Sequence, residues 1–223
     1  MTSRRIATGV LTLVTFALVW FAIAGRVGWW QGWVVLLVFA GYLAALLFRL
    51  SRKDPELIRE RMASADRAEP WDRILMRVYT GVLLTLLLVV ALDSGRFRWS
   101  AVPPEFQAAG WLLLVLGGAM TWHVMMTNAY LSSYARLQQD RNQTVVQEGA
   151  YGWIRHPMYL GIITAFLGLP LALGSWWGLF PTLLIVAIFI YRTYREDLML
   201  TAGLVGYPEY AARVRYRLLP GVW

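Results

Sequence analysis

The feature that most constrains this chain is a series of apolar runs, each about long enough to cross a lipid bilayer. A helix rises about 1.5 Å per residue, so about 20 residues span about 30 Å of hydrocarbon. The 223-residue chain is 58% hydrophobic and 15% charged, whereas about a quarter of the residues are charged in a typical soluble domain. The sequence therefore predicts an all-α fold, a polytopic membrane helix bundle.

Several runs in the sequence fit this length. The last two are almost contiguous and are expected to form a C-terminal helical hairpin, so the prediction is five to six transmembrane helices. Arg4-Arg5 before the first run and Ala22-Ile23-Ala24 after it leave a cleaved signal peptide as an alternative for that run. The predicted spans are 6–24, 29–48, 74–92, 106–130, 158–174 and 176–191.

Basic residues are distributed unevenly between the two predicted sides of the membrane. With six spans, all of the 21 Lys and Arg residues except Arg26, Arg96 and Arg98 fall on the side that holds both termini. Such an excess marks the cytosolic side. The formal net charge of +8 would suggest nucleic acid in a soluble protein, but here it indicates cytosolic loops, and no nucleic-acid partner is expected.

Cysteine is absent, and histidine occurs only at His123 and His156. This excludes disulfides, thiolate nucleophiles and cysteine-ligated metal, and it disfavours a histidine-rich metal site. His123, in the fourth run, is expected to be a core residue bonded to a neighbouring helix. The segment 49–73 fits two interpretations, an amphipathic helix along the membrane interface or a solvated connector.

Two polar stretches, 134–159 and 191–197, adjoin the predicted hairpin on the cytosolic side. At Arg155-His156-Pro157, proline suits the first turn of a helix, and the free N–H groups there favour an anion. The alternative is an ordinary proline-started helix with a snorkelling arginine. Arg192 and Glu196 share a helical face, either as part of a site or as an intrahelical ion pair. Asn128 is a candidate to bind substrate or to hold a break in the backbone.

Three motifs together resemble the isoprenylcysteine carboxyl methyltransferase family and its bacterial relatives. They are QTVVQEGAY at 143–151, RHPMYLG at 155–161, and Arg192 followed by Glu196-Asp197. The ending GYPEY at 206–210, with RLLP at 217–220, is similar to the tails of the bacterial relatives. The resemblance covers about residues 120–223. It departs from the family at Gln143, where the family often has His, and at Asp197, where the family has Glu.

The resemblance implies an integral membrane methyltransferase that uses S-adenosylmethionine and acts on a hydrophobic or lipid-like acceptor, a carboxylate being one option. Arg192 is the implied catalytic residue and contacts substrate together with Asn128. The site is expected to face the cytosol of a bacterial inner membrane. The expected cofactor-binding residues are Gln143, Val145, Val146, Gly149, Tyr151, Arg155, His156, Tyr159, Glu196 and Asp197.

We expect a single membrane domain over residues 1–223. Within it, residues 1–130 would shape the path of the substrate from the lipid, and residues 131–223 would bind the cofactor. Two other functions fit parts of the sequence. An NADPH-dependent reductase of the sterol reductase type shares a related tail, and a non-enzymatic transporter or assembly protein is compatible with the spans. The sequence does not indicate an oligomeric state.

Overall fold

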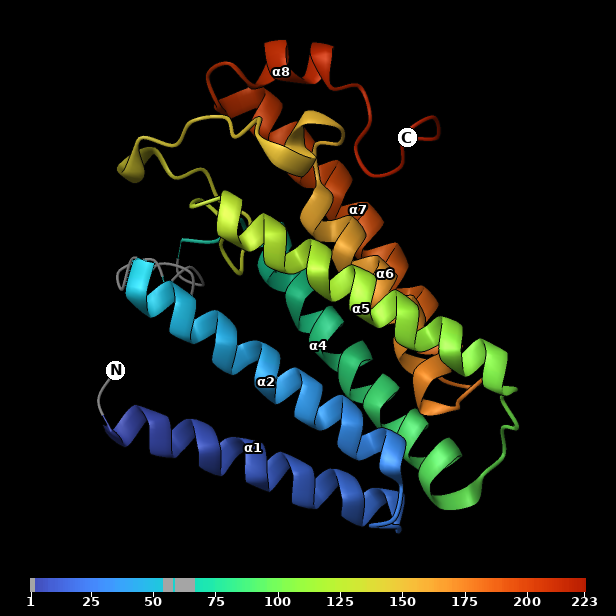
Figure 1. Cartoon of the computed structure of the whole chain (residues 1–223). Helices are drawn as coiled ribbons and strands as arrows, with labels where there is room; N and C mark the ends of the chain where they lie inside the picture. Colours follow the sequence, from blue (N-terminus) through green and yellow to red (C-terminus); the bar gives the residue numbers. More distant parts are fainter. Residues whose placement is uncertain (1–2, 54–57, 59–66) are drawn as a thin grey trace.

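The computed structural model of the chain describes residues 3–53, 58 and 67–223, and every regular element in these residues is helical (Figure 1). This confirms the predicted all-α class. The elements in chain order are α1 (Ser3–Ala24), α2 (Trp30–Lys53), α4 (Pro70–Val90), the π-helical η2 (Ala91–Phe97), α5 (Pro104–Thr127), the 3₁₀ turns η3 (Gln139–Arg141) and η4 (Gly149–Gly152), α6 (Pro157–Leu173), α7 (Leu179–Gly203) and α8 (Tyr207–Arg213).

In the described residues, four helical stretches are long and apolar enough to span a membrane: Ala7–Ala24, Trp30–Arg52, Pro70–Phe97 and Pro104–Thr127. The remaining two predicted spans appear as α6 and α7 but differ in kind. The apolar helix α6 has 17 residues. In α7, with 25 residues, charged side chains begin at Arg192, so its C-terminal half is polar. The predicted bundle is thus confirmed, with a hairpin of one short and one partly polar helix.

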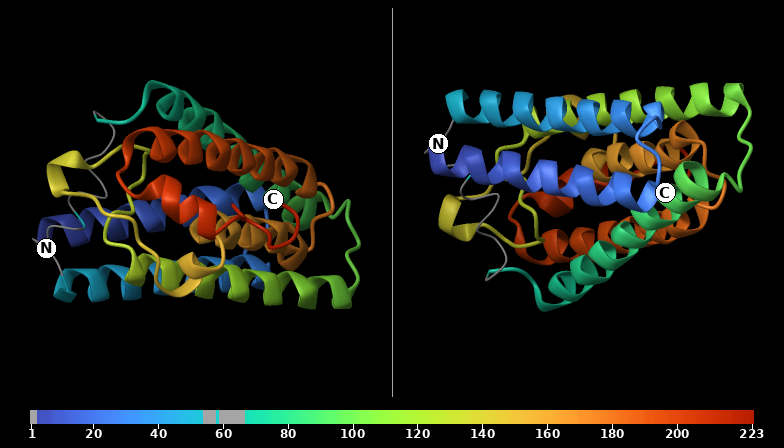
Figure 2. Two further views of the ribbon diagram at one scale, coloured as in Figure 1. Left: turned by 90° about the horizontal axis from the view of Figure 1, so that it is seen from above. Right: turned by 90° about the horizontal axis from the view of Figure 1, so that it is seen from below.

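The long helices run roughly along one axis, and the polar segments gather at one end of the bundle (Figures 1 and 2). The segment 131–156, α8 and the C-terminal tail lie at this end, together with the C-terminus of α5 and the start of α6. The segment 49–73, for which an interfacial helix was one prediction, lies partly outside the described residues. A core cluster that includes Trp20, Leu86, Ile163 and Phe189 joins α1, α4, α6 and α7.

Close packing of α5 against α6 depends on glycine. Gly110 and Gly117 on α5 and Gly161 and Gly168 on α6 are each seven residues apart, so each pair lies on one face of its helix. A Cβ at Gly117 would lie 2.5 Å from the backbone N of Ala165. Small residues allow this backbone approach inside a membrane, where contact and dispersion stabilise helix pairs. The pair forms a rigid support for the segment that follows α5.

At the opposite end of the bundle, a buried carboxylate fixes the hairpin. Asp93, in η2, accepts hydrogen bonds from the hydroxyls of Ser100 (2.6 Å) and Ser175 (2.5 Å). Ser175 lies in the turn between α6 and α7, so Asp93 ties the end of the third span to that turn. The two polar ends of the bundle therefore have separate hydrogen-bond networks, and the more extensive one lies at the end that holds the segment 131–156 and α8.

Replacing Gly117 with leucine should push α5 away from α6, because the new side chain meets backbone atoms that cannot move independently. Overpacking of this kind costs about 1–3 kcal/mol, so the thermal unfolding midpoint in detergent should fall. Gly118 is the matched control, since a Cβ there meets nothing within 4 Å. A Gly117→Leu protein as stable as Gly118→Leu would contradict the close packing.

The absence of cysteine permits a direct test of the predicted orientation. Ala202 lies near the end of α7 and Ala101 in the connection between η2 and α5, and both are exposed. If both termini are cytosolic, a membrane-impermeant maleimide should label Ala202→Cys in sealed inside-out vesicles and Ala101→Cys in right-side-out vesicles. The reverse pattern would contradict the orientation derived from the basic residues.

Candidate active site

A cavity of about 320 Å³ lies where the helical bundle meets the polar segments. Its wall is formed by α4, the segment 128–146, the start of α6, the second half of α7, and α8. The side chains that line it from the helices include the apolar Met76, Ile162 and Phe189. Small-molecule sites usually occupy about 300–1,000 Å³, so this cavity has room for one small ligand that contacts both polar and apolar groups.

The cavity brings together all but two of the residues that the sequence singled out, although they come from distant parts of the chain. The two halves of the resemblance, the RHPMYLG turn and the acidic end of α7, face one another across it. The predicted residues in its wall are Asn128, Gln143, Val145, Val146, Tyr151, Arg155, His156, Tyr159, Arg192 and Glu196.

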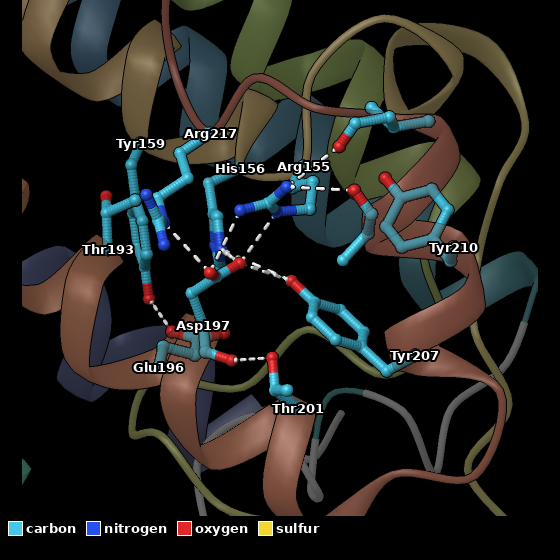
Figure 3. Close-up of polar contacts among 12 residues, drawn as sticks. Arg155, His156, Tyr159, Thr193, Glu196, Asp197, Thr201, Tyr207, Tyr210 and Arg217 are labelled. Carbon is cyan, nitrogen blue, oxygen red and sulfur yellow. Dashed lines mark hydrogen bonds and ion pairs between the residues drawn. The ribbon is translucent and has the colours of Figure 1, made fainter. Parts of the chain in front are cut away.

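Asp197 does not line the cavity and instead forms a buried hub behind its wall (Figure 3). Arg155 binds it with both prongs of the guanidinium, Nε to Oδ1 at 2.8 Å and Nη2 to Oδ2 at 3.0 Å. Oδ2 also accepts from Nε of Arg217 at 2.8 Å, and Oδ1 from the Tyr207 hydroxyl at 2.9 Å. One carboxylate thus joins α7, the turn before α6, α8 and the C-terminal tail.

Electrostatics at the hub favour the ionised carboxylate. Asp197 lies beyond the predicted span of α7, which ends at Tyr191. Burial by itself would raise the pKa of Asp197. The hydrogen bonds that its carboxylate accepts from His156, Arg155 and Tyr207 outweigh burial and hold the pKa well below the usual value. Burial and the same carboxylate raise the pKa of the Tyr207 phenol well above its ordinary value, so Tyr207 stays a donor.

The contacts of Arg155 leave little of its guanidinium for a ligand. Besides Asp197, its Nη1 donates to the carbonyls of Val214 (2.8 Å) and Arg215 (3.1 Å). Its backbone N–H donates to the carbonyl of Tyr216 at 2.9 Å. Arg155 therefore ties the C-terminal tail to the start of α6, a role the sequence did not predict. The snorkelling arginine considered above is wrong, because the side chain is buried.

His156 stands between the hub and the cavity. Its Nε2 lies 3.3 Å from Oδ1 of Asp197, and its ring stacks parallel to that of Tyr159 at 5.8 Å between centroids. The backbone N–H of His156 donates to the carbonyl of Arg217. Its ring is thus oriented by a carboxylate on one side and an aromatic ring on the other, while it still forms part of the cavity wall.

Aromatic rings make up a large part of the wall, and several of their hydroxyls form hydrogen bonds with protein groups. The Tyr159 hydroxyl donates to Glu196, and the Tyr210 hydroxyl donates to the carbonyl of Tyr151 at 2.8 Å. The Tyr151 hydroxyl accepts from the amide of Asn128 at 2.7 Å. Fixed hydroxyls hold the rings in place, so the wall presents ring faces, which attract cations, next to the carboxylate of Glu196. The aromatic residues of the wall are Tyr79, Tyr130, Tyr134, Tyr151, Tyr159, Phe189, Tyr207 and Tyr210.

Arg192 has a partner that the sequence did not indicate. Its Nε lies 2.9 Å from Oδ1 of Asp72, in the first turn of α4, and Nη2 donates to Oδ2 at 2.9 Å. The guanidinium also lies over the Tyr159 ring, 5.4 Å from its centroid. The ion pair within α7 that was one interpretation of Arg192 and Glu196 is therefore replaced by one between α7 and α4.

Three sequence expectations look different in the structure. Asn128 ends α5, and its amide bonds the Tyr151 hydroxyl and the backbone N–H of Tyr130, so it holds a backbone break in addition to lining the cavity. His123 is exposed and not a core residue. Gly149 lies outside the cavity wall at φ 61°, where an added Cβ would come within 2.7 Å of the His123 ring, so its position reflects a close approach.

Sequence reasoning missed Asp72, Tyr207 and the segment 130–133, all of which line or support the cavity. A signal existed for Asp72, because an ionised group in the first turn of a helix long enough to span a membrane is costly unless it is paired. The segment 130–133 carries no motif, and only its position after α5 brings it to the wall.

Replacing Asp197 with asparagine should destabilise the protein strongly, because Arg155 would be left buried without its counter-ion. Losing one partner of a buried pair costs about 3–5 kcal/mol. Asp140→Asn is the control, since the Asp140 side chain is 44% exposed and pairs with the exposed Arg67 as well as with Arg136. The measurement is the thermal midpoint in detergent.

The pH dependence gives an independent check on this hub. A lowered pKa in the folded state stabilises the protein above the unfolded pKa of about 3.9, and this contribution is lost as the pH falls further. The gap in midpoint between wild type and Asp197→Asn should therefore narrow below about pH 4. A gap that stays constant down to pH 3 would contradict a charged hub.

Comparison with known proteins adds to this geometry. Residues 106–203 match the family model described as phospholipid methyltransferase, and no curated protein matches the chain. The matched residues include α5, α6, α7 and the polar segment between α5 and α6, which supply most of the cavity wall. The resemblance to integral membrane methyltransferases is thereby confirmed over residues 106–203, where the chain is similar to the phospholipid methyltransferase family.

Proposed function

We propose that this protein is an S-adenosylmethionine-dependent methyltransferase of a bacterial inner membrane that acts on a hydrophobic or lipid-like acceptor. The family match supports a membrane methyltransferase with a lipid-like substrate. The observation that carries the proposal is the cavity in which His156, Tyr159 and Glu196 meet between two polar segments and an apolar bundle. Its predicted orientation faces the cytosol, where the cofactor is available.

The residues present fit the chemical groups of this cofactor, which has a sulfonium cation, an amine and a carboxylate. The aromatic ring of Tyr151 suits a cation, and Glu196, held by the Tyr159 hydroxyl, is an acceptor for the amine or a ribose hydroxyl. Val145 and Val146 offer apolar contact to an adenine ring. Arg155 is occupied, and the N–H groups of Tyr159 and Leu160 bond the carbonyl of His156. The backbone N–H of Met158, at the start of α6 and in the cavity wall, is therefore the better candidate for the carboxylate.

The bound cofactor supplies an activated methyl group, which passes to the acceptor by direct displacement as the carbon–sulfur bond breaks. For this the protein mainly has to align the acceptor and exclude water. The apolar residues Met76, Ile162 and Phe189, which come from three helices, provide a dry wall at the bundle side of the cavity. A chain without cysteine and with two histidines is compatible with this chemistry, because it requires neither a thiolate nor a metal.

The acceptor would approach from the bundle side, and Arg192 would contact it. Arg192 lies in the wall next to Tyr159, about one turn of α7 before Glu196. A guanidinium suits an acceptor that carries a carboxylate, as in methyl ester formation, or a polar head group with exposed oxygens. In either case we assign Arg192 a holding role and not that of a general base.

Replacing Glu196 with glutamine should weaken binding of S-adenosylmethionine, because a charged acceptor becomes neutral. Hydrogen bonds to charged groups contribute about 1.5–3 kcal/mol, which corresponds to a roughly ten- to hundredfold rise in Kd. Isothermal titration calorimetry on the protein in detergent measures this rise. The fold should remain, since Glu196 is only partly buried.

Glu209→Gln is the matched control, because Glu209 is an exposed glutamate on α8, and its Kd should equal that of wild type. NADPH titrated under the same conditions should give no heat of binding. Saturable NADPH binding without S-adenosylmethionine binding would favour the reductase alternative, and equal affinities for Glu196→Gln and Glu209→Gln would remove Glu196 from the site.

A further inference from the structure

The guanidinium of Arg192 is only partly occupied by the protein. Nε pairs with Asp72, and Nη2 donates to Asp72 and to the carbonyl of Ser133 at 2.9 Å. Within the described part of the chain, Nη1 has no hydrogen-bond acceptor, although Arg192 lies in the cavity wall. Two nitrogens are therefore fixed by protein atoms and the third remains as a donor for a ligand.

Asp72 is well placed to fix that arrangement. It is fully buried in the first turn of α4, and its Oδ2 also accepts the backbone N–H of Ala135 at 2.6 Å. The carbonyl of Ala135 in turn accepts the backbone N–H of Glu69 at 3.0 Å. The start of α4, the segment that lines the cavity and the polar half of α7 are thus joined at one carboxylate.

The physical consequence is that Asp72 pairs with the charge of Arg192 and fixes its direction. Paired side-on contacts between a carboxylate and a guanidinium fix the plane of the guanidinium. The guanidinium lies over the Tyr159 ring, whose hydroxyl donates to Glu196. Without Asp72 the guanidinium would be a buried charge lacking its partner and would seek other acceptors, Glu196 being the nearest carboxylate in the cavity wall.

We propose that Asp72 is a positioning residue that orients Arg192 so that its Nη1 is presented to the methyl acceptor. Residue 72 lies outside the matched residues 106–203, so a helix of the front half of the chain completes the site. The proposal rests on the methyltransferase function proposed above and adds a residue that neither the sequence motifs nor the family match assigned.

A double-mutant cycle tests this. Membranes containing wild type, Asp72→Asn, Arg192→Gln or both changes are incubated with saturating methyl-labelled S-adenosylmethionine, and label in the organic-solvent extract is counted per mole of protein. We expect each single change to lower turnover about ten- to hundredfold, with the cofactor Kd within threefold of wild type. The double variant should be no slower than Arg192→Gln, because Asp72 would act only through Arg192.

Arg192→Lys provides a second test in case Asp72→Asn does not fold. It keeps the positive charge beside Asp72 but lacks the guanidinium fork. It should lower turnover as Asp72→Asn does. Wild-type turnover in Arg192→Lys or Asp72→Asn would overturn the proposal. So would a double variant whose loss is the product of the two single losses, because that pattern indicates a general structural role for Asp72.

An NMR measurement separates failure of this proposal from failure of the proposed function. The Nε–H resonance of Arg192, assigned by its absence in Arg192→Gln, should shift and exchange faster with water in Asp72→Asn. If wild type binds no S-adenosylmethionine, the methyltransferase function fails whatever the resonance does. If the resonance does not change in Asp72→Asn, Asp72 does not orient Arg192 and the positioning role fails by itself.

Discussion

The buried carboxylate of Asp197 is the group on which the cavity-bearing end of this protein depends. It joins α7 to Arg155, His156, Tyr207 and Arg217, which come from the turn before α6, from α8 and from the tail. A lone buried charge would be unfavourable, but here the partners stabilise the carboxylate, and the carboxylate in turn accepts hydrogen bonds from donors that would otherwise need water. Because of this hub, the turn before α6, α8 and the tail are held together beside the cavity.

Two further buried carboxylates join other elements of the fold. Asp93 closes the opposite end by bonding Ser100 and Ser175. Asp72 connects α4 to Arg192 and to the segment beside the cavity. Between them, glycines let α5 and α6 approach closely, which sets where the segment after α5 begins. The polar contacts therefore lie at the ends of apolar helices, where water or protein partners can satisfy them, and the middle of the bundle is left to packing.

Much of the candidate site was predictable from the sequence, because its motifs are local. RHPMYLG predicted a proline-started helix, and α6 begins at Pro157. His156, Tyr159, Glu196 and Arg192 all line the cavity, as expected for neighbours in one site. The different roles of adjacent residues were not predictable. Glu196 and Asp197 differ by one position on α7, and this rotation of about 100° turns one carboxylate to the cavity and the other to the hub.

The sequence by itself determined the helical membrane class, the approximate spans and the residue types that gather at one end, because apolar length and local spacing are properties of the linear chain. Only the tertiary structure decided the pairing of charges. Arg192 and Asp72 are 120 residues apart, and Arg155 and Asp197 are 42 apart. Which carboxylate meets which guanidinium depends on how helices cross and rotate, and those angles result from packing over the whole bundle, which no local pattern encodes.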